Sequence, residues 1–334
     1  MTPAPPSRTL CADGIRLTTI STGAAVAGLR LEDSEGGWTD VVLGHADRRS
    51  YRHGGYLGAV IGRVGNRIDR GRFELDGATH QVSVDERGNA LHGGVEGFDL
   101  REWELVDAAA DHVTWGLVSP AGDQGFPGEV RVQVRYRLSP GEVRLDYSAT
   151  TTAPTPLNLT HHAYFNLDGE SSGTIREHRL QVEADTFIPT RPDQIPTGEV
   201  REVAGTAFDL RQPTPLAAPL SAADEQVRIA GGIDHHFVVR GEGMRRHATL
   251  VGGSGRRLEV WSDRPGVQVY TGDHFDGTIT GISGSAYHRE AGVALETQGP
   301  PDAINQPGFP SPVLRPGETF RSWTVWRVGT SDPI

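Results

Sequence analysis

The sequence predicts an all-β protein, a large antiparallel β-sandwich with few short helices. Its 43 glycines and 22 prolines are spread along 334 residues rather than gathered in a linker, which is typical of many short strands joined by turns. Apolar and polar residues alternate over Val130–Leu138, and Pro140 and Gly141 separate this run from a second one at Val143–Ala149. Alternation with period two places the apolar side chains on one face. We therefore predict an antiparallel hairpin here.

Further strands are expected where short apolar runs lie between turn residues. The predicted ranges are Arg72–Leu75, Leu180–Ile188, Arg257–Trp261, Val267–Tyr270, Gly292–Glu296 and Ser322–Val328. The best helix signal covers Ser221–Ile229, where Ser221 with Asp224 three residues later resembles a capping box. No repeat of fixed period is visible, so we expect a single domain over residues 1–334.

The composition argues against several classes of function. A net charge of −11 disfavours nucleic acid or an acidic membrane surface as partner, because both recruit clustered positive charge. The chain has no lysine, which excludes a lysine Schiff base, and one cysteine, Cys11, which excludes disulfide frameworks and cysteine-rich zinc sites. The start MTPAPPSRTL lacks a signal-peptide pattern, and eighteen apolar residues never stand together. We expect a cytoplasmic protein.

Five segments place polar, titratable groups among small or apolar residues. They are Gly62–Ile68, Leu91–Gly94, Asn158–Leu167, Gly232–Phe237 and Leu295–Gln298. Each segment alone is more often a turn or a solvated group than a site. The two His-His pairs could ligate a metal together with Asp234 or Glu296. Adjacent strand residues point to opposite faces, however, so each pair offers one ligand to a cavity and a metal site is disfavoured.

Taken together, the five segments resemble those of the aldose 1-epimerase family, also called galactose mutarotases, from about Gly58 to the C-terminus. The motifs that match in order and spacing are GRVGNRI, LHGG followed by GFD and a Trp, NLTHHAYFNL, GGIDHHF, PGVQVYTG, and LETQ followed by PDAINQPGFPSPVLRPGE. The resemblance implies a β-supersandwich with an open sugar cleft. It also implies an enzyme that interconverts the α and β anomers of free aldohexoses such as glucose and galactose, without a metal or organic cofactor.

The resemblance implies a role for each site residue. Glu296 corresponds to the general base and His162 to the general acid. The groups that hold the sugar hydroxyls are implied to be Asn66, Arg67, His92, Asp234 and Gln268. The chain departs from the family pattern at His161, where Asn is frequent, and this side chain is expected to point away from the cleft. It departs again at Asp273-His274, where Asn and an aromatic residue are usual, and this change would alter one wall of the site.

Anomer exchange needs one group that removes the proton of the C1 hydroxyl and another that protonates the ring oxygen. After rotation about C1–C2 the ring closes from the other face. Positioned proton-transfer groups typically contribute ~10²–10⁴-fold each. Free glutamate has a pKa near ~4.3 and free histidine one near ~6.5, so we expect an ionised Glu296 and a protonated His162 near neutral pH.

Three alternatives remain open from the sequence. A sugar-phosphate 1-epimerase would bring extra arginines to the rim of the cleft. A glycoside hydrolase needs two carboxylates flanking the scissile bond, for which Asp234 and Glu296 are the candidates. A non-catalytic carbohydrate-binding protein would leave Glu296 and His162 without a purpose. The expected partner is a small neutral sugar, and the expected assembly is a monomer or homodimer.

Overall fold

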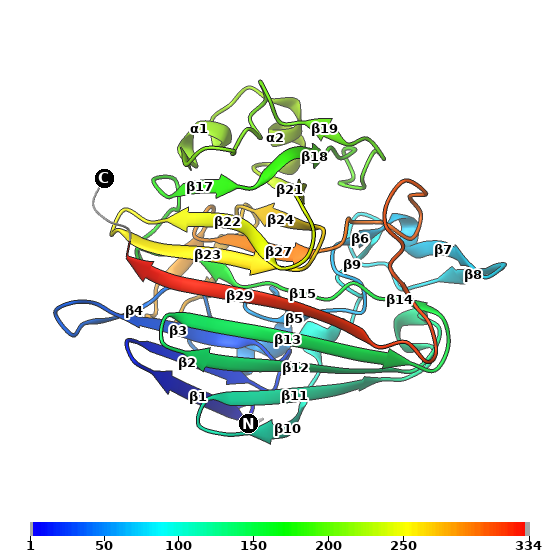
Figure 1. The fold of residues 1–334 in the computed structure, drawn as a ribbon, viewed down its shortest axis with the longest axis horizontal. Coiled ribbons are helices and arrows are strands. Elements are labelled where there is room, and N and C mark those ends of the chain that lie inside the picture. The colour runs from blue at the N-terminus through cyan, green and yellow to red at the C-terminus, as the bar shows by residue number, and fades with distance from the viewer. Residues whose placement is uncertain (1–2, 331–334) are drawn as a thin grey trace.

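The computed structural model describes residues 3–330, in which two large antiparallel β-sheets dominate (Figure 1). This confirms the all-β antiparallel class. The nine-stranded sheet contains, in spatial order, β10 (Glu104–Ala108), β11 (His112–Ser119), β12 (Val130–Ser139), β13 (Glu142–Thr151), β29 (Phe320–Thr330), β23 (Arg256–Ser262), β22 (Arg245–Val251), β17 (Arg179–Val182) and β20 (Thr214–Pro215). The six-stranded sheet contains β16 (Tyr164–Phe165), β27 (Val293–Gln298), β24 (Gly266–Tyr270), β21 (Asp234–Val239), β18 (Ala184–Ile188) and β19 (Arg201–Glu202).

Smaller ladders surround these two sheets. A four-stranded sheet consists of β1 (Ser7–Ala12), β2 (Ile15–Ile20), β3 (Val26–Glu32) and β4 (Trp38–Asp40). The two-stranded ladders pair β5 (Val60–Ile61) with β15 (Thr160–His161), β6 (Arg67–Ile68) with β9 (Ala90–Leu91), β7 (Arg72–Leu75) with β8 (Ala78–Gln81), β14 (Thr155–Pro156) with β28 (Val313–Leu314), and β25 (Asp276–Thr280) with β26 (Ala286–His288). The four-stranded sheet lies outside the strands predicted from the sequence, although Asp13-Gly14 between β1 and β2 is a typical hairpin signal.

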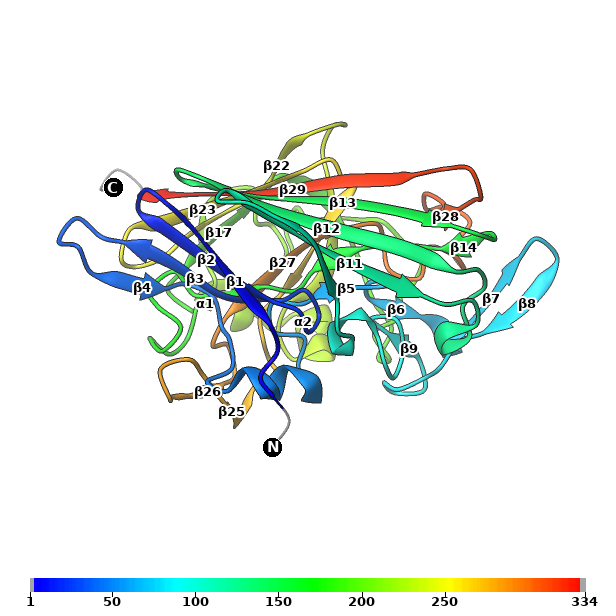
Figure 2. The same cartoon turned by 90° about the horizontal axis from the view of Figure 1, so that it is seen from below.

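The core lies between the two large sheets: the six-stranded sheet lies behind the nine-stranded sheet in Figure 1 and below it in Figure 2. On β12 the residues from Val130 to Leu138 alternate between buried and more exposed positions, and β13 pairs with it antiparallel from Ser139–Glu142 onward. The predicted hairpin is therefore confirmed. Phe237 of β21 and Leu295 of β27 join the same apolar cluster from the other sheet. Each such side chain contributes about 1.5–3 kcal/mol on burial.

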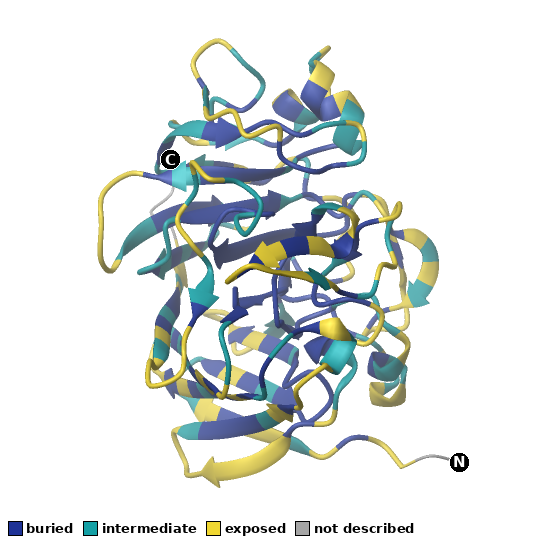
Figure 3. Cartoon of the chain, turned by 90° about the vertical axis from the view of Figure 1, so that its right-hand side faces the viewer, coloured by how far each residue is buried: buried dark blue, intermediate teal, exposed yellow. Residues whose placement is uncertain are grey.

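Burial falls off toward the outside of this core (Figure 3). The central strands are mostly buried, whereas every residue of the edge strand β10 is exposed. No helix in residues 3–330 is long and apolar enough to cross a membrane. The predicted single domain over residues 1–334 includes residues 1–2 and 331–334, which lie outside the described part.

The predicted strands at 72–75, 257–261, 267–270, 292–296 and 322–328 match β7, β23, β24, β27 and β29 within a few residues. The predicted strand Leu180–Ile188 is wrong as one element. It is two strands, because the chain crosses at Glu183 from the nine-stranded sheet (β17) to the six-stranded sheet (β18). The Glu183 carboxylate is held by Arg240 and Arg246 at this crossing. Both halves bury apolar side chains, so the run reads as continuous in the sequence.

Helices are few and short. They are α1 (Ala217–Leu220), α2 (Glu225–Ala230) and the 3₁₀ turns Arg48–His53, Asp69–Gly71, Phe98–Leu100 and Asp123–Gly125. The predicted capping box at Ser221 is wrong. Asp224 itself caps α2, with its Oδ1 accepting from the Gln226 amide at 2.8 Å, and Ser221 ends α1. An aspartate accepts this bond as well as a serine does, so the cap can lie three residues later than predicted.

A glycine turn after β9 brings the backbone at Gly93 into contact with the backbone at Gly62. Gly93 has φ of +96°, and a Cβ there would lie 2.0 Å from the carbonyl oxygen of Gly62. Only glycine permits both this backbone conformation and this approach. Because the turn directly follows His92, it fixes the position of the His92 backbone.

We predict that Gly93→Ala destabilises the fold by more than about 3 kcal/mol, because strain and clash combine. Gly88→Ala is the matched control: Gly88 also has a positive φ, +81°, but open space at its Cβ. It should cost about 1–2 kcal/mol from backbone strain alone. Urea unfolding of the two variants measures the difference. Equal losses would show that the approach of Gly93 to Gly62 is not tight.

Candidate active site

A cavity of about 550 Å³ opens beside the six-stranded sheet. Its walls come from β21, β24 and β27 of that sheet and from the loops around residues 55–56, 85–92, 194 and 230–231. The predicted site residues that line it are Asn66, Arg67, His92, His162, Asp234 and Glu296. These six residues come from five separate segments of the sequence, which the fold brings together.

Glu296 and His162 face each other in this cavity. Glu296 lies within β27, opposite Gln268 of β24, while its neighbour Leu295 turns into the core. His162 follows β15, and its amide donates to the Ala59 carbonyl at 2.9 Å, which fixes its backbone. The His162 Nε2 and Glu296 Oε1 atoms lie 3.4 Å apart, and both side chains are almost fully buried. A proton-holding pair is thus present at the predicted positions.

Burial moves the pKa values of this pair in opposite directions. Desolvation, reinforced by the charge of Asp234, raises the pKa of Glu296 well above its ordinary value, although Arg67 opposes this. Desolvation lowers the pKa of His162 to about 3. The expected protonated His162 is therefore wrong for the free enzyme, because the expectation used the pKa of a solvated histidine. Burial also works against the expected ionised Glu296. Burial therefore favours the form of the pair with a neutral imidazole and a carboxylic acid over the imidazolium–carboxylate form.

Three tyrosines enclose the pair and were missed in the sequence analysis. Tyr56 stacks on His162 with ring centroids 5.8 Å apart, Tyr164 lies at 4.7 Å, and Tyr270 meets it edge-on at 6.3 Å. These rings exclude water from the imidazole, which is the cause of its lowered pKa. Tyr164 stands in the NLTHHAYFNL motif and Tyr270 in PGVQVYTG, so their proximity to quoted motifs was an available signal; nothing in the sequence distinguishes Tyr56.

The guanidinium of Arg67 lies at the centre of a set of acceptors. Its Nε donates to Glu86 Oε2 at 3.0 Å, Nη1 lies 3.6 Å from Asp234 Oδ2, and Nη2 donates to Gln194 Oε1. Asn66, with φ of +61°, uses its Oδ1 to accept the Arg67 amide at 2.9 Å. Glu86 and Gln194 come from loops outside the motifs, so the sequence analysis did not find them.

The hydrogen bonds of His92 fix its tautomer. Its Nδ1 accepts the backbone amide of Asn66 at 3.1 Å, so in the neutral ring the proton must reside on Nε2. The pKa of His92 lies well below its ordinary value because the ring is buried beside His162 and Arg67. His92 therefore presents a hydrogen-bond donor and no charge to the cavity.

Gln268 does not line the cavity. Its side chain is buried and donates from Nε2 to Asp234 Oδ1 at 2.6 Å. His235 lies next to Asp234 but on the opposite side of β21, where its Nδ1 accepts the Asp234 amide at 3.2 Å and Nε2 meets Gln226 Oε1 at 3.0 Å. Gln268 is thus placed to orient the Asp234 carboxylate rather than to contact a ligand.

The two departures from the family pattern lie in different surroundings. His161 points into the core, where its ring meets Trp326 at 5.0 Å and Tyr136 at 5.9 Å. The expectation that it points away from the cleft is confirmed. Asp273 and His274 both line the cavity. His274 stacks on Tyr270, and its Nδ1 lies 2.7 Å from the tyrosine hydroxyl, so the substituted pair does form part of one wall.

One group of residues within 3–330 brings possible metal ligands together: His92, His162 and Glu296, whose ligand atoms lie within 4.8 Å of one another. A ligating imidazole nitrogen must be free of its proton. His92 carries its proton on Nε2, because Nδ1 is already engaged by Asn66. Only His162 and Glu296 then remain, and two ligands are fewer than the three that catalytic zinc sites use. The donor set does not fit a metal.

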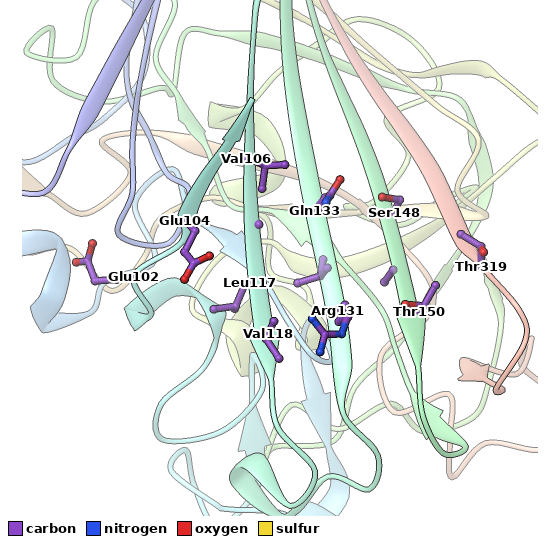
Figure 4. Close-up of a pocket in the computed structure, with 13 residues that line it drawn as sticks. Glu102, Glu104, Val106, Leu117, Val118, Arg131, Gln133, Ser148, Thr150 and Thr319 are labelled. Carbon is purple, nitrogen blue, oxygen red and sulfur yellow. The ribbon is translucent and has the colours of Figure 1, made fainter. Parts of the chain in front are cut away.

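A second hollow lies on the outer face of the nine-stranded sheet (Figure 4). Side chains of β10 to β13 line it, among them Glu104, Val106, Arg131 and Gln133, and Thr319 borders it. These polar groups stand on the exposed positions of the alternating strands. The hollow contains no histidine and no buried acid–base pair. The candidate active site is therefore the cavity beside the six-stranded sheet.

Comparison with known proteins gives a consistent result. The family model described as aldose 1-epimerase matches residues 6–327. Galactose mutarotase of Bos taurus is 44% identical over 320 residues, covering 95% of this chain and 92% of that protein. Aldose 1-epimerase of Escherichia coli strain K12 is 37% identical over 321 residues, covering 94% and 92%.

Solved structures agree in fold over nearly the whole chain. An aldose epimerase homologue from C. elegans superimposes with a TM-score of 0.92 at 28% identity, covering 98% of this chain and all of that one. Galactose 1-epimerase from Lactobacillus acidophilus gives a TM-score of 0.85 at 26% identity, covering 97% and 94%. By family model, sequence identity and fold together, the chain belongs to the aldose 1-epimerase family.

Proposed function

We propose that the protein is an aldose 1-epimerase that interconverts the α and β anomers of free aldohexoses such as galactose and glucose. Glu296 is the general base and His162 the general acid. The observation that carries the proposal is the 3.4 Å approach of these two buried groups in a cavity rich in hydrogen-bonding side chains. The direct test is polarimetry on freshly dissolved α-D-galactose and α-D-glucose with catalytic amounts of protein.

The reaction moves two protons in opposite senses. In the ring-opening step the Glu296 carboxylate takes the proton of the C1 hydroxyl, and the His162 imidazolium gives one to the ring oxygen as the C1–O5 bond breaks. The aldehyde turns about C1–C2, and ring closure returns both protons. Arg67, Asp234, Asn66 and the Nε2–H of His92 hold the hydroxyls, so that the C1–O5 bond stays beside both groups.

One proton shared by the pair is enough for this cycle. The imidazolium–carboxylate form starts ring opening, and the imidazole–carboxylic acid form is what ring opening leaves behind. In water the charged form is favoured by roughly 2 pK units, about 3 kcal/mol. Burial penalises that form, as the raised pKa of Glu296 and the lowered pKa of His162 show. The site thus brings the two forms closer in energy, which suits a reaction that must run both ways.

The charges around the cavity favour a neutral sugar over a sugar phosphate. Its lining contains the carboxylates of Asp85, Glu86, Asp234, Asp273 and Glu296 but only three arginines, one of which is the deeply buried Arg67. The other two are already paired at 2.9 Å, Arg87 with Glu86 and Arg289 with Asp273. A phosphate group would have to displace these partners and approach an acidic surface.

The remaining alternatives fit less well. In a glycoside hydrolase Asp234 would have to serve as the second catalytic carboxylate, yet it is engaged by Gln268 and Arg67. The group that faces Glu296 directly is the imidazole of His162. A non-catalytic binding protein has no need for a buried Glu–His pair, which costs free energy to desolvate. A small-molecule sugar as partner, a monomeric or homodimeric state and a cytoplasmic location remain part of this proposal.

Replacing the proton-transfer groups should separate chemistry from binding. Glu296→Gln keeps the size and hydrogen bonds of the side chain but removes the base, so kcat should fall by about 10²–10⁴-fold while sugar binding persists. His162→Asn should behave likewise. Asp234→Asn and Arg67→Gln remove hydroxyl anchors and should raise KM as well as lower kcat. Polarimetric kinetics with the uncatalysed rate subtracted give both constants.

Glu104→Gln is the matched control, because it makes the same change in the outer hollow of the nine-stranded sheet. It should retain wild-type kinetics. If Glu296→Gln kept near wild-type kcat while Asp234→Asn abolished it with the fold intact, Asp234 would become the candidate base.

The pH dependence of kcat/KM should be a broad bell. A glutamate with a raised pKa loses the shared proton only at higher pH, and a histidine with a lowered pKa gains a second proton only at lower pH. Both shifts widen the range in which the pair holds one proton. The acid limb should therefore lie well below the ordinary histidine value of ~6.5. The limbs belong to the coupled pair. An acid limb near 6.5 would contradict the assignment.

Activity should survive exhaustive dialysis against a chelator, because the tautomer of His92 leaves too few ligands for a metal. The measurement compares mutarotation rates before dialysis, after it, and after addition of zinc. A loss that zinc or another divalent ion restores would overturn the metal-free mechanism.

A further inference from the structure

Gln194 is a deeply buried glutamine at the wall of the cavity, outside every motif discussed above. Its side chain lines the cavity, and only 6% of the residue is exposed. It has a positive φ of +62°, a backbone conformation that glutamine rarely adopts. Such residues persist where the surrounding structure imposes them. We therefore expect the conformation of Gln194 to serve a purpose in the cavity.

The loop that carries Gln194 is held rigidly at both ends. The turn closes through Gln194 N to Arg191 O at 2.8 Å and Arg191 N to Ile195 O at 2.9 Å. Asp193 pairs with the Arg191 guanidinium at 2.9 Å, and Arg191 also reaches Asp69 at 3.3 Å. The loop presents Gln194 from a fixed frame.

The base of the same loop is tied to the site through α2. Gln226 accepts the Thr190 amide at 2.7 Å and donates to the Thr190 carbonyl at 3.1 Å. The same Gln226 oxygen meets His235, the residue next to Asp234. One hydrogen-bond network thus connects the loop that carries Gln194 with His235, the neighbour of Asp234.

The orientation of the Gln194 amide follows from its partner. Arg67 can only donate, so the atom that meets its Nη2 must be the amide oxygen, Oε1. The amide nitrogen, Nε2, hydrogen-bonds to no protein atom within residues 3–330 and is not among the buried unpaired atoms. Since the side chain lines the cavity, Nε2 is the group it presents there.

We propose that Gln194 is a specificity-determining residue, which donates a hydrogen bond from Nε2 to one hydroxyl of the sugar. This inference rests on the proposed epimerase function. Within residues 3–330 the side chain of Gln194 hydrogen-bonds to Arg67 and to neither Glu296 nor His162, so its amide nitrogen stays available to a sugar in the cavity. The neighbouring Glu86 and Asp234 accept hydrogen bonds, and a neutral donor beside them complements a hydroxyl, which both donates and accepts.

The consequence is selectivity among aldohexoses. A donor that is held by Arg67 and by a rigid loop cannot follow a hydroxyl that is inverted or missing. A sugar that lacks the hydroxyl leaves Nε2 without its partner, which lowers transition-state binding. The loss for a neutral hydrogen bond corresponds to roughly 3- to 10-fold in kcat/KM.

The test compares wild type with Gln194→Ala on galactose, glucose and their 2-, 3-, 4- and 6-deoxy derivatives by polarimetry. In wild type one deoxy sugar should be about 3- to 10-fold poorer than its parent because of this contact. In Gln194→Ala that penalty should vanish for this sugar alone, with the other penalties unchanged. Gln194→Glu preserves the acceptor for Arg67 but removes the donor, so it should lose the same penalty. Gln212→Ala, an exposed glutamine outside the cavity, should leave all ratios unchanged.

The outcomes distinguish the two levels of the proposal. A wild-type protein that accelerates no mutarotation refutes the proposed function itself. An active wild type, with equal losses on every sugar in Gln194→Ala, refutes only this inference and makes Gln194 a support for Arg67. Retention of wild-type selectivity by Gln194→Glu also refutes it, because that variant has no donor at Nε2. Loss of selectivity for one hydroxyl in both variants supports it.

Discussion

The buried guanidinium of Arg67 is the interaction on which the site depends. A charge in the interior must be paired, because an isolated buried cation is very costly. Its nitrogens meet this demand through Glu86, Asp234 and Gln194, which belong to three separate segments of the chain. The Arg67 guanidinium thereby holds the loops that carry Glu86 and Gln194 beside Asp234 of the six-stranded sheet. The shape of the cavity follows from how this one charge is satisfied.

The same exclusion of water sets the chemistry of the reacting pair. Tyrosine rings surround His162, and Glu296 lies within a central strand, so neither side chain is well solvated. Burial disfavours their charged forms, so the imidazole–carboxylic acid form of the pair is favoured over the ion pair. The low dielectric of the interior thus serves both the fold and the reaction.

Recognition of a neutral ligand is consistent with the charges of the whole molecule. The chain carries a net charge of −11, and the cavity lining is itself rich in carboxylates. Arg67 pairs with both Asp234 and Glu86 and so offsets part of this negative charge. Gln268 donates a hydrogen bond to Asp234 and orients its carboxylate. In the proposed function, directional hydrogen bonds rather than net electrostatic attraction select the sugar.

Local sequence patterns determined much of the architecture. The hairpin from Val130 to Ala149 was predictable because period-two alternation between turn residues requires no knowledge of distant contacts. The resemblance of the motifs pointed to Glu296 and His162, and the structure brings them together. The direction of His161 followed from strand geometry, since its neighbour His162 faces the cavity.

The tertiary structure decided what depends on contacts between distant segments. The run Leu180–Ile188 divides between two sheets, which no local pattern reveals because both halves bury apolar side chains. Gln268 donates to Asp234 instead of lining the cavity, a contact between two strands that no local pattern reveals. Gln194 enters the site from a loop more than a hundred residues from Arg67. The sequence by itself determined the alternating hairpin and the motifs that carry the titratable residues. The tertiary structure decided the remaining strands and the solvation and partners of those residues, because burial and pairing arise only when segments far apart in the chain pack together.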